Sequence, residues 1–213
     1  MKIFLDTAHA GEVNRRHKGL LSGVTTNPTL IAKSGSTPHE VYQEILDIGI
    51  RDLSIEVEGK HFDEFIANSL SIYNTYGDRC TIKLPCIPDG LQACKYLTNK
   101  GIRVNMTLVF SVSQAILCSI AGATYVSPFV GRLDDNGQDG VSLIRDIAKV
   151  YCIHMSKTKI LAASIRSAQS AAKCFASGAH ICTVPPSVYD NMFKHVLTDK
   201  GFAQFLQDFD RNV

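Results

Sequence analysis

Residues 80–107, CTIKLPCIPDGLQACKYLTNKGIRVNMT, pass from a strand-like run to a helix-like run and back to a strand-like run. The middle segment is amphipathic and ends at Gly101. A glycine directly before a strand is typical of a helix end, because glycine adopts positive φ without steric cost. The stretch therefore predicts two parallel strands joined by a helical crossover.

The same alternation runs along the whole chain. The strand candidates are residues 2–6, 23–26, 53–57, 80–84, 103–107, 124–128, 159–164 and 180–184. The helix candidates are residues 38–49, 61–77, 88–101, 111–123, 141–151 and 167–179. Eight strand–helix units without a linker predict one α/β domain over residues 1–213, a single (β/α)8 (TIM) barrel. An open, doubly wound sheet is the alternative, although no strand is followed by a glycine-rich nucleotide-binding turn.

One extra helix is expected after the eighth unit. Residues 197–211 place Phe202, Phe205, Leu206 and Phe209 on one side of an amphipathic helix. A helix added to a finished barrel needs a surface to cover. That surface lies either on its own barrel or on a neighbouring subunit.

The composition narrows the classes of function. The chain is 45% hydrophobic and 20% charged, which is typical of a globular protein with one large core. Its net charge is +2 and its longest basic run is RRHK at 15–18, too sparse for a nucleic-acid footprint. No segment approaches the ~20 apolar residues of a membrane span, and no signal peptide is recognised. We expect a cytoplasmic protein that binds neither nucleic acid nor membrane.

Seven cysteines are scattered along the chain without a CxxC pair. Their mostly apolar neighbours indicate buried, reduced thiols. Cys80 and Cys86 flank Lys83, but their separation is not a metal-ligand spacing. The seven histidines fall mainly in predicted helices or loops. We therefore expect neither a metal nor another cofactor.

Lys83 is unusual because it is a charged residue inside a predicted strand. Neighbouring side chains of a strand point to opposite faces, so Ile82 and Leu84 pack on helices while Lys83 points into the barrel. The same alternation predicts an inner set that consists of Asp6, Glu56, Lys83, Asn105, Thr107 and Ser127, together with Ile160, Ala162 and Ser164 from the seventh strand. Asn27 joins the set from the turn after the second strand. Most of these residues lie near the carboxyl ends of the strands, where barrel enzymes have their active sites.

Each polar residue of this set also has a purely structural explanation. Asp6 could cap a helix together with Thr7, and Glu56 could form a structural ion pair with Lys83. The set as a whole favours a functional site. Burying an amine, two carboxylates and several hydroxyl or amide groups costs on the order of several kcal/mol in desolvation.

An inward lysine suits carbonyl chemistry. An amine in a partly apolar site is neutral more readily than one in water, and a neutral amine forms a Schiff base with a carbonyl. The iminium accepts electrons when a nearby carbon–carbon bond breaks. Asp6 or Glu56 would move the proton, directly or through a water held by Thr107. Metal-assisted aldol chemistry would need a histidine cluster that the sequence does not indicate.

A phosphate site is expected beside the lysine. Arg132 follows the sixth strand, and Ser164 and Arg166 lie where the seventh strand passes into its helix. Barrels often bind phosphate in this region through loop amides and helix N-termini. The alternative is that Arg132 pairs with Asp134 or Asp135 while Arg166 is solvated.

Several motifs together resemble the transaldolase family, especially its short branch, which includes the fructose-6-phosphate aldolases. They are FLDTA (4–8), GVTTNPTLIAK (23–33), TIKLP (81–85), GIRVNMTLVFS (101–111), AGATYVSPFVGRLDD (121–135), LAASIR (161–166) and LTDKG (197–201). Their common order along the chain makes the resemblance more specific than any single motif. One departure is CIPD at 86–89, where many relatives carry a small or hydroxyl residue soon after the proline. This departure leaves the start of the next helix open.

The resemblance implies a class I aldolase barrel that binds sugar phosphates. It also implies a homo-oligomer, a pentamer or a decamer, in which residues 197–211 pack on a neighbouring subunit. The residues implied in catalysis are Lys83 (Schiff base), Asp6 (proton transfer), and Glu56 and Thr107 (catalytic water). The residues implied in substrate binding are Thr26, Asn27, Asn105, Ser127 and Phe129, and those implied in phosphate binding are Arg132, Ser164 and Arg166.

The reaction implied by the resemblance is that of a transaldolase. A dihydroxyacetone unit moves from sedoheptulose 7-phosphate to glyceraldehyde 3-phosphate, giving erythrose 4-phosphate and fructose 6-phosphate in the pentose phosphate pathway. The alternative is a fructose-6-phosphate aldolase that releases free dihydroxyacetone. That branch carries Gln at the position of Glu56 and Tyr at the position of Phe129, so both residues favour transaldolase. A third hypothesis, a non-catalytic sugar-phosphate-binding barrel, is disfavoured because Lys83, Asp6 and Thr107 occur together with Glu56.

Overall fold

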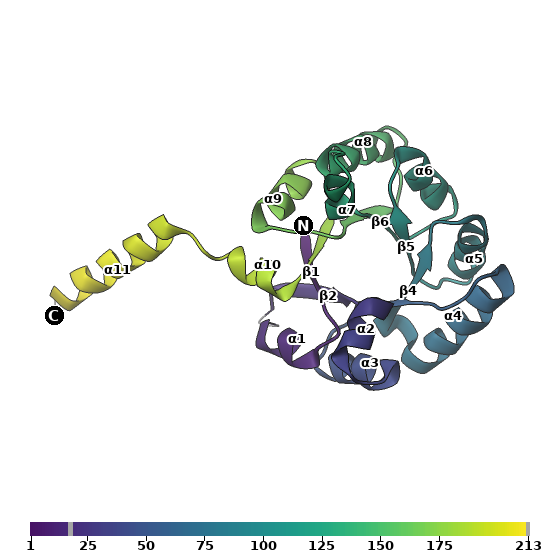
Figure 1. The fold of residues 1–213 in the computed structure, drawn as a ribbon, viewed down its shortest axis with the longest axis horizontal. Helices are drawn as coiled ribbons and strands as arrows, with labels where there is room; N and C mark the ends of the chain where they lie inside the picture. The colour runs from purple at the N-terminus through teal and green to yellow at the C-terminus, as the bar shows by residue number, and fades with distance from the viewer. Residues whose placement is uncertain (17–18, 212–213) are drawn as a thin grey trace.

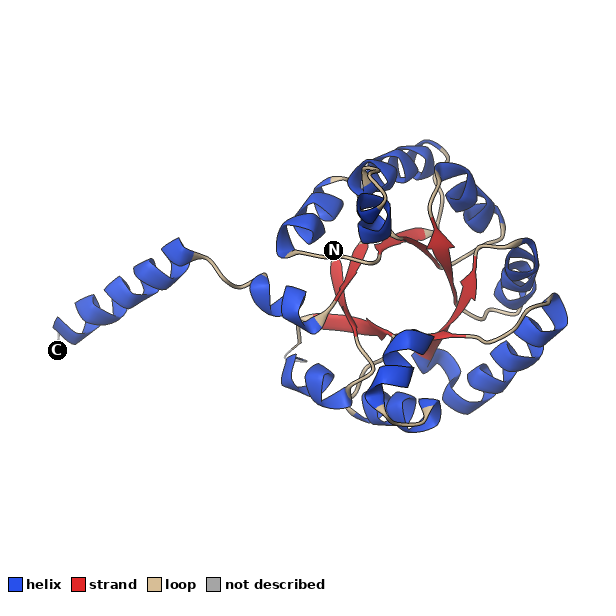
Figure 2. Ribbon diagram, viewed as in Figure 1, coloured by secondary structure: helices blue, strands red, loops and turns tan. Residues whose placement is uncertain are grey.

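Eight parallel strands close into a barrel in the computed structural model (Figure 2). They are β1 (Lys2–Asp6), β2 (Leu21–Thr25), β3 (Leu53–Glu56), β4 (Cys80–Pro85), β5 (Val104–Val109), β6 (Tyr125–Pro128), β7 (Lys159–Ala162) and β8 (Ile181–Val184). Their order around the barrel is their order in the sequence, and β1 pairs with β8 as well as with β2. This closure confirms the (β/α)8 prediction over the open sheet.

The structure describes residues 1–16 and 19–211. Positions 17–18 of the basic run, with one of the seven histidines, lie outside the described residues. Residues 212–213, at the end of the expected domain, do so too.

Helices surround the barrel (Figure 1). They are α1 (Ala10–Arg16), α2 (Pro28–Ser34), α3 (Pro38–Asp47), α4 (Phe62–Tyr76), α5 (Pro88–Asn99), α6 (Val112–Ile120), α7 (Val130–Asp135), α8 (Gly140–Ile153), α9 (Ala168–Ala176), α10 (Pro186–Asn191) and α11 (Val196–Arg211), with a 3-10 turn at Gly77–Arg79. The six predicted crossover helices are confirmed. Helices α1, α2, α7 and α10 were not predicted, since segments of six or seven residues are too short to show a helical period.

Two turns from a helix to a strand contain glycines with positive φ, one of them the predicted Gly101. Gly101 and Gly178 have φ values of 79° and 102°, and each follows a helix and precedes a strand. The structure also shows where the helix after residues 86–89 begins, which the sequence left undecided. The helix begins at Pro88, and its third residue, Gly90, packs so closely on the carbonyl of Pro85 that a Cβ there would lie 2.1 Å from the oxygen.

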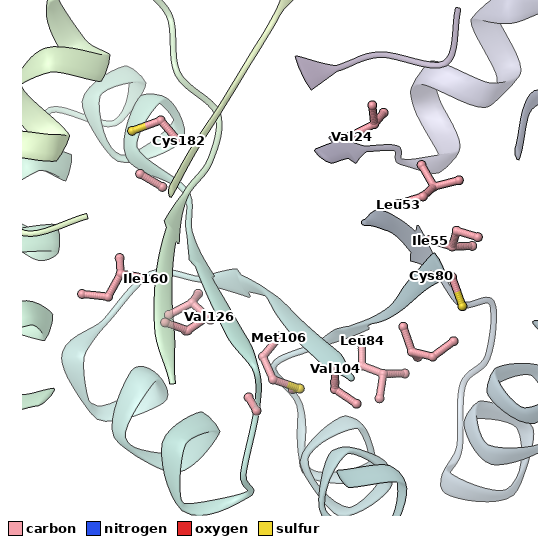
Figure 3. Packing of buried hydrophobic residues seen from close by; sticks show 14 of the residues in the cluster. Val24, Leu53, Ile55, Cys80, Leu84, Val104, Met106, Val126, Ile160 and Cys182 are labelled. Carbon is pink, nitrogen blue, oxygen red and sulfur yellow. The ribbon is translucent and has the colours of Figure 1, made fainter. Parts of the chain in front are cut away.

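The main core lies between the barrel and its helices. Figure 3 shows residues of this layer, among them Ile55, Leu84, Met106 and Val126, pointing outward from the strands. The outward parity predicted for Leu84 and its neighbour Ile82 is therefore confirmed.

The parity predicted for β7 is wrong. Ile160 and Ala162 belong to the outer core, whereas Leu161 lies inside the barrel with Phe4 and Ile181. Both faces of this strand are apolar, so its sequence carried no alternation that could assign them.

A network of polar side chains closes the amino end of the barrel. Asp52, directly before β3, is buried. Its Oδ1 accepts a hydrogen bond from Thr81 (2.8 Å), and its Oδ2 accepts bonds from Arg103 (2.8 Å) and the Tyr125 hydroxyl (2.7 Å). The Tyr125 ring also meets Phe4 edge to face, with centroids 6.2 Å apart. This floor leaves the carboxyl ends of the strands as the open side of the barrel.

The predicted C-terminal helix is confirmed, and α11 projects away from the barrel (Figure 1). The phenylalanines of its apolar side, Phe202, Phe205 and Phe209, are 62%, 63% and 69% exposed, and none of the residues of α11 is buried. The helix therefore does not cover its own barrel. Across the described ranges, no helix combines the length and the apolar character that crossing a membrane requires.

All seven cysteines are reduced, and five of them are buried as expected. Two differ from the expectation. Cys86 is only partly buried, and Cys152 is exposed near the end of α8.

Candidate active site

A cavity of about 510 Å³ opens at the carboxyl ends of the strands. Most of the residues predicted for the site line it: Asp6, Asn27, Glu56, Lys83, Ser127, Phe129, Arg132, Ser164 and Arg166. The other three predicted residues, Thr26, Asn105 and Thr107, are buried in the wall around the lysine. The structure thus brings residues from seven of the barrel units to one place.

Lys83 occupies the centre of the site and is only 5% exposed. Its Nζ donates hydrogen bonds to Glu56 Oε2 (2.9 Å) and to the backbone carbonyl of Thr26 (3.1 Å). Register explains the first contact, since Glu56 and Lys83 are directly paired across β3 and β4. Thr26 thus contacts the lysine through its backbone carbonyl. Its hydroxyl instead donates a hydrogen bond to the carbonyl of Ser54. The ion pair considered from the sequence therefore exists, and it lies on the wall of the cavity.

Asp6 lies at the end of β1, on the same cavity as Lys83. Its Oδ1 accepts a hydrogen bond from the Thr25 hydroxyl (2.8 Å), which in turn contacts the hydroxyl of Thr183 (2.6 Å). Burial raises the pKa of Asp6, and the Thr25 bond and the charge of Lys83 oppose that shift. Thr7, rather than Asp6, accepts the local bond from the His9 backbone. The carboxyl of Asp6 is thus a desolvated group that takes up a proton more readily than an exposed aspartate.

Thr25 and Thr183 are site residues that the sequence analysis missed. Thr25 is paired in register with Asp6, and its neighbour on the same face, Gly23, lies against the inner ring of Phe4. Strict alternation along β2 (LSGVT, 21–25) and β8 (ICTV, 181–184) would have placed both threonines on the inner face of the barrel.

Thr107 carries a hydroxyl that is available for bonding. The residue is buried, and among the described residues its Oγ1 has no hydrogen-bond partner. A buried hydroxyl without a partner is unfavourable and is typical of a place where a ligand or water binds.

Asn105 and Ser127 form a second buried network on the other side of Lys83. The Ser127 hydroxyl donates to Asn105 Oδ1 (2.7 Å), and Asn105 Nδ2 donates to Ser54 Oγ (3.3 Å). Asn105 is also paired with Lys83 across β4 and β5. These bonds fix the amide orientation beside the lysine. Asn27 is fixed differently, as the N-cap of α2, where its Oδ1 accepts from the Leu30 backbone (3.0 Å).

The two arginines of the expected phosphate site have different partners. The Arg132 guanidinium lies 4.9 Å from the centroid of the Phe129 ring, and Phe110 packs on the same ring at 5.7 Å. Arg166 donates to Asp135 at 2.7 Å, with both side chains largely exposed. Among the described residues, Arg132 forms no ion pair with Asp134 or Asp135: Asp135 pairs with Arg166, and Asp134 Oδ1 accepts from the Gly140 N–H at 3.0 Å.

Ser164 reaches the cavity by a route that strand alternation did not describe. It follows β7 and adopts a left-handed backbone with φ 58°. Gly131, at the start of α7, donates from its N–H to the Ser164 carbonyl at 3.0 Å. A Cβ on Gly131 would lie 2.2 Å from that oxygen and 2.6 Å from Arg166 Nε. The absence of a side chain at Gly131 thus lets Ser164 and Arg166 sit side by side at the mouth.

The charged groups of this cavity are of three kinds: an amine, carboxylates and guanidinium groups. Within residues 1–16 and 19–211, no three histidine, cysteine, aspartate or glutamate side chains gather in a way that could hold a metal ion. The cavity instead combines one amine, two carboxylates and two arginines.

Fold and cavity together define a (β/α)8 barrel with a lysine–carboxylate site at the carboxyl ends of its strands. Comparison with known proteins agrees with this class and defines it further. Residues 3–212 match the family model described as Transaldolase/Fructose-6-phosphate aldolase. The chain belongs to this family.

Curated relatives match almost from end to end. A probable transaldolase of Symbiobacterium thermophilum is 46% identical over 211 residues, which cover 99% of this chain and 97% of that protein. A probable transaldolase 1 of Listeria monocytogenes is also 46% identical, over 99% and 98% of the two chains. A probable transaldolase of Nitrosopumilus maritimus is 44% identical, over 99% and 96%. The chain is therefore an enzyme of the transaldolase/aldolase type.

The raised pKa of Asp6 predicts a pH-dependent effect on stability. A carboxyl with a raised folded-state pKa stabilises the fold most below its unfolded pKa of about 4, and this contribution is lost as the pH rises through the folded value. The substitution Asp6→Asn is therefore expected to raise the thermal midpoint at pH 7. The gain should shrink towards zero as the pH approaches about 4.

Circular dichroism melts at both pH values would measure this difference. The exposed Asp47→Asn variant serves as the control and is expected to change the midpoint little at either pH. A lower midpoint for Asp6→Asn at pH 7, or an equal gain at both pH values, would contradict the prediction.

Proposed function

We propose that this protein is a transaldolase that works through a Schiff base on Lys83. The observation that carries the proposal is the place of Lys83 Nζ, buried on the cavity wall and bonded to Glu56 Oε2 at 2.9 Å. Asp6 shares the same cavity as a desolvated carboxyl. An amine next to two carboxylates of different environment is the set of groups that Schiff-base aldol chemistry needs.

The proposed cycle begins when the Lys83 amine attacks the keto carbon of a ketose phosphate. Loss of water gives an iminium. Glu56 and Thr107 hold the water that is released here and used again when the product leaves. The free hydroxyl of Thr107 supports this role.

Bond cleavage follows between the α and β carbons of the iminium. Asp6 takes the proton of the adjacent hydroxyl as that bond breaks, an aldose phosphate leaves, and a three-carbon enamine stays on Lys83. The acceptor aldehyde then adds to the enamine, and Asp6 returns the proton to the new hydroxyl. The raised pKa of Asp6 suits a group that must both accept and donate a proton.

Substrate binding is assigned to the groups around the lysine. Asn27, Asn105 and Ser127 contact the hydroxyls of the three-carbon unit, and the Thr26 carbonyl orients the amine. Arg132, Ser164 and Arg166 bind the phosphate at the mouth of the cavity. Arg166 would exchange the Asp135 carboxylate for the phosphate in this step, because both groups compete for the same guanidinium.

Phe129 supports transfer over release of the three-carbon unit. Its ring lies on the cavity wall between Phe110 and Arg132 and carries no hydroxyl. No additional proton donor therefore stands there to promote hydrolysis of the enamine. The bound unit waits for an acceptor aldehyde, in a reaction that places the protein in the pentose phosphate pathway of the cytoplasm.

Borohydride trapping tests the Schiff base. When the protein is mixed with fructose 6-phosphate and borohydride, the peptide that contains Lys83 should gain a reduced three-carbon adduct, found by mass spectrometry. The variant Lys83→Met should show no adduct and should lose activity by several orders of magnitude, because the nucleophile is removed. The exposed Lys60→Met variant is the control and should still be trapped on Lys83. An adduct on another lysine, or none, would refute the mechanism.

Dependence on an acceptor distinguishes transaldolase from aldolase. With fructose 6-phosphate alone, we expect about one turnover per site, because the enamine is held. Addition of erythrose 4-phosphate should give sustained release of glyceraldehyde 3-phosphate, followed in a coupled assay. Phe129→Tyr should raise the turnover without acceptor, and Phe129→Leu, which lacks the hydroxyl, should not. Sustained turnover of the unchanged protein without acceptor would favour the aldolase reaction.

We also propose that residues 197–211 pack on a neighbouring subunit of a homo-oligomer, a pentamer or a decamer. Helix α11 leaves its own barrel and exposes a row of phenylalanines (Figure 1). Apolar rows of this size are typical of interfaces rather than of solvated helices.

Sedimentation velocity tests this packing. The triple variant Phe202→Ser, Phe205→Ser and Phe209→Ser should sediment as smaller species than the unchanged chain, because the apolar contact is lost. Gln207→Ser, on the same helix, should not alter the sedimentation. A monomeric unchanged chain, or a triple variant of unchanged size, would rule out the proposed packing.

A further inference from the structure

Two thiols meet just after the end of β4, the strand that carries Lys83. Cys86 follows the last residue of β4, and Cys118 lies on the inner face of α6. Their Sγ atoms are 3.6 Å apart. Cys86 Sγ also lies 4.0 Å from the carbonyl of Gln114, one turn before Cys118 on the same helix. The Cys86 side chain therefore lies along α6, although its backbone belongs to the segment that carries Lys83.

The two thiols differ in their exposure and in their pKa. Cys86 is partly exposed, whereas Cys118 is fully buried. The contact with Cys118 lowers the pKa of the Cys86 thiol, and the same contact together with burial raises that of Cys118. Cys86 is therefore the member of the pair that a small oxidant would meet first, and the buried Cys118 is the one that would react second.

We propose that Cys86 and Cys118 form a reversible disulfide under hydroperoxide and that this bond lowers the activity of the enzyme. In the first step, the Cys86 thiolate attacks hydrogen peroxide, giving a sulfenic acid on Cys86 and hydroxide. In the second step, the Cys118 thiol condenses with the sulfenic acid, a sulfur–sulfur bond forms, and water leaves. The two thiols supply the two electrons that reduce the peroxide. A dithiol such as dithiothreitol returns both cysteines to thiols.

The Cys86–Cys118 disulfide would alter the active site because the backbone around Cys86 can move little without moving its neighbours. A disulfide requires an S–S distance of about 2.05 Å, so the two sulfur atoms must approach each other by roughly 1.5 Å. The Cys86 N–H donates to the Thr107 carbonyl at 2.9 Å, and Gly90 packs on the carbonyl of Pro85. Movement at Cys86 is therefore passed to Thr107 and to Lys83. A displacement of about 1 Å at reacting groups can cost about 100-fold in rate.

The chain contains its own controls for this reaction. Cys174 and Cys182 are a second thiol pair in contact, between α9 and β8, but both are fully buried. Cys152 is exposed and has no cysteine partner among the described residues. Cys174 and Cys182 thus have proximity without access, and Cys152 has access without proximity. Among the cysteines of the described residues, only Cys86 and Cys118 combine the two.

The experiment treats the reduced, full-length protein with hydrogen peroxide and stops the reaction with an alkylating agent. Non-reduced tryptic digests then show which cysteines are linked. Cys86 shares its tryptic peptide with Cys94, so fragmentation must locate the bond. Activity is measured before oxidation, after it, and after dithiothreitol. The variants are Cys86→Ser and Cys118→Ala, with Cys152→Ser as the matched control.

We expect a Cys86–Cys118 bond in the unchanged protein and in Cys152→Ser, with activity about 10- to 100-fold lower and restored by dithiothreitol. Cys86→Ser and Cys118→Ala should show no such reversible loss. Absence of the bond would overturn the proposal, as would a bond that leaves the activity unchanged or an equal reversible loss in both cysteine variants. The activity measurement rests on the proposed function, but the peptide mapping does not, so the two proposals can fail separately.

Discussion

The contact between Lys83 Nζ and Glu56 Oε2 is the constraint around which the barrel is arranged. A buried amine is costly unless it is paired, and the direct register of β3 and β4 places the carboxylate 2.9 Å from it. The third partner, the carbonyl of Thr26, comes from the end of β2. Three consecutive strands must therefore keep their register for the charge to be satisfied. Closure of β8 on β1 then brings Asp6 to the same cavity.

This arrangement divides the inside of the barrel into two levels. At the amino end, Asp52 binds Thr81, Arg103 and Tyr125. These three bonds join Asp52 to β4, to the residue before β5 and to β6, so this level is suited to holding the barrel closed. At the carboxyl end, the hydroxyl of Thr107 has no partner among the described residues. The bonded network and the cavity thus lie at opposite ends of the same strands, and barrel enzymes usually carry their active sites at the carboxyl end.

The groups that surround the lysine are held by contacts that a ligand can replace. Arg132 makes a cation–π contact with the Phe129 ring, and Arg166 donates a hydrogen bond to the exposed carboxylate of Asp135. Such exposed contacts are worth only about 0.2 to 1 kcal/mol, so a phosphate dianion can compete with them. Cys86 follows β4, the strand that carries Lys83, and its thiol lies against α6. In the proposal made above, its oxidation changes the same strand end that positions the lysine.

Much of this protein follows from local patterns in its chain. The strand–helix alternation predicted the barrel, and the polar residues that alternate with apolar ones in β1 and in β3 to β6 predicted the inward Asp6, Glu56 and Lys83. The ordered motifs predicted the family. Local pattern suffices here because a strand with one polar and one apolar face can be oriented in only one way without burying unpaired charge.

Other features depended on contacts between distant segments. The apolar faces of β7 were distinguished only by packing, which put Leu161 inside with Phe4. Ser164 reaches the cavity through a left-handed backbone, and Arg166, in the loop before α9, bonds Asp135 at the end of α7. These outcomes are set by register and barrel closure, which join residues far apart in the chain. The side-chain pattern of one segment contains no information about the partner that closure will bring to it.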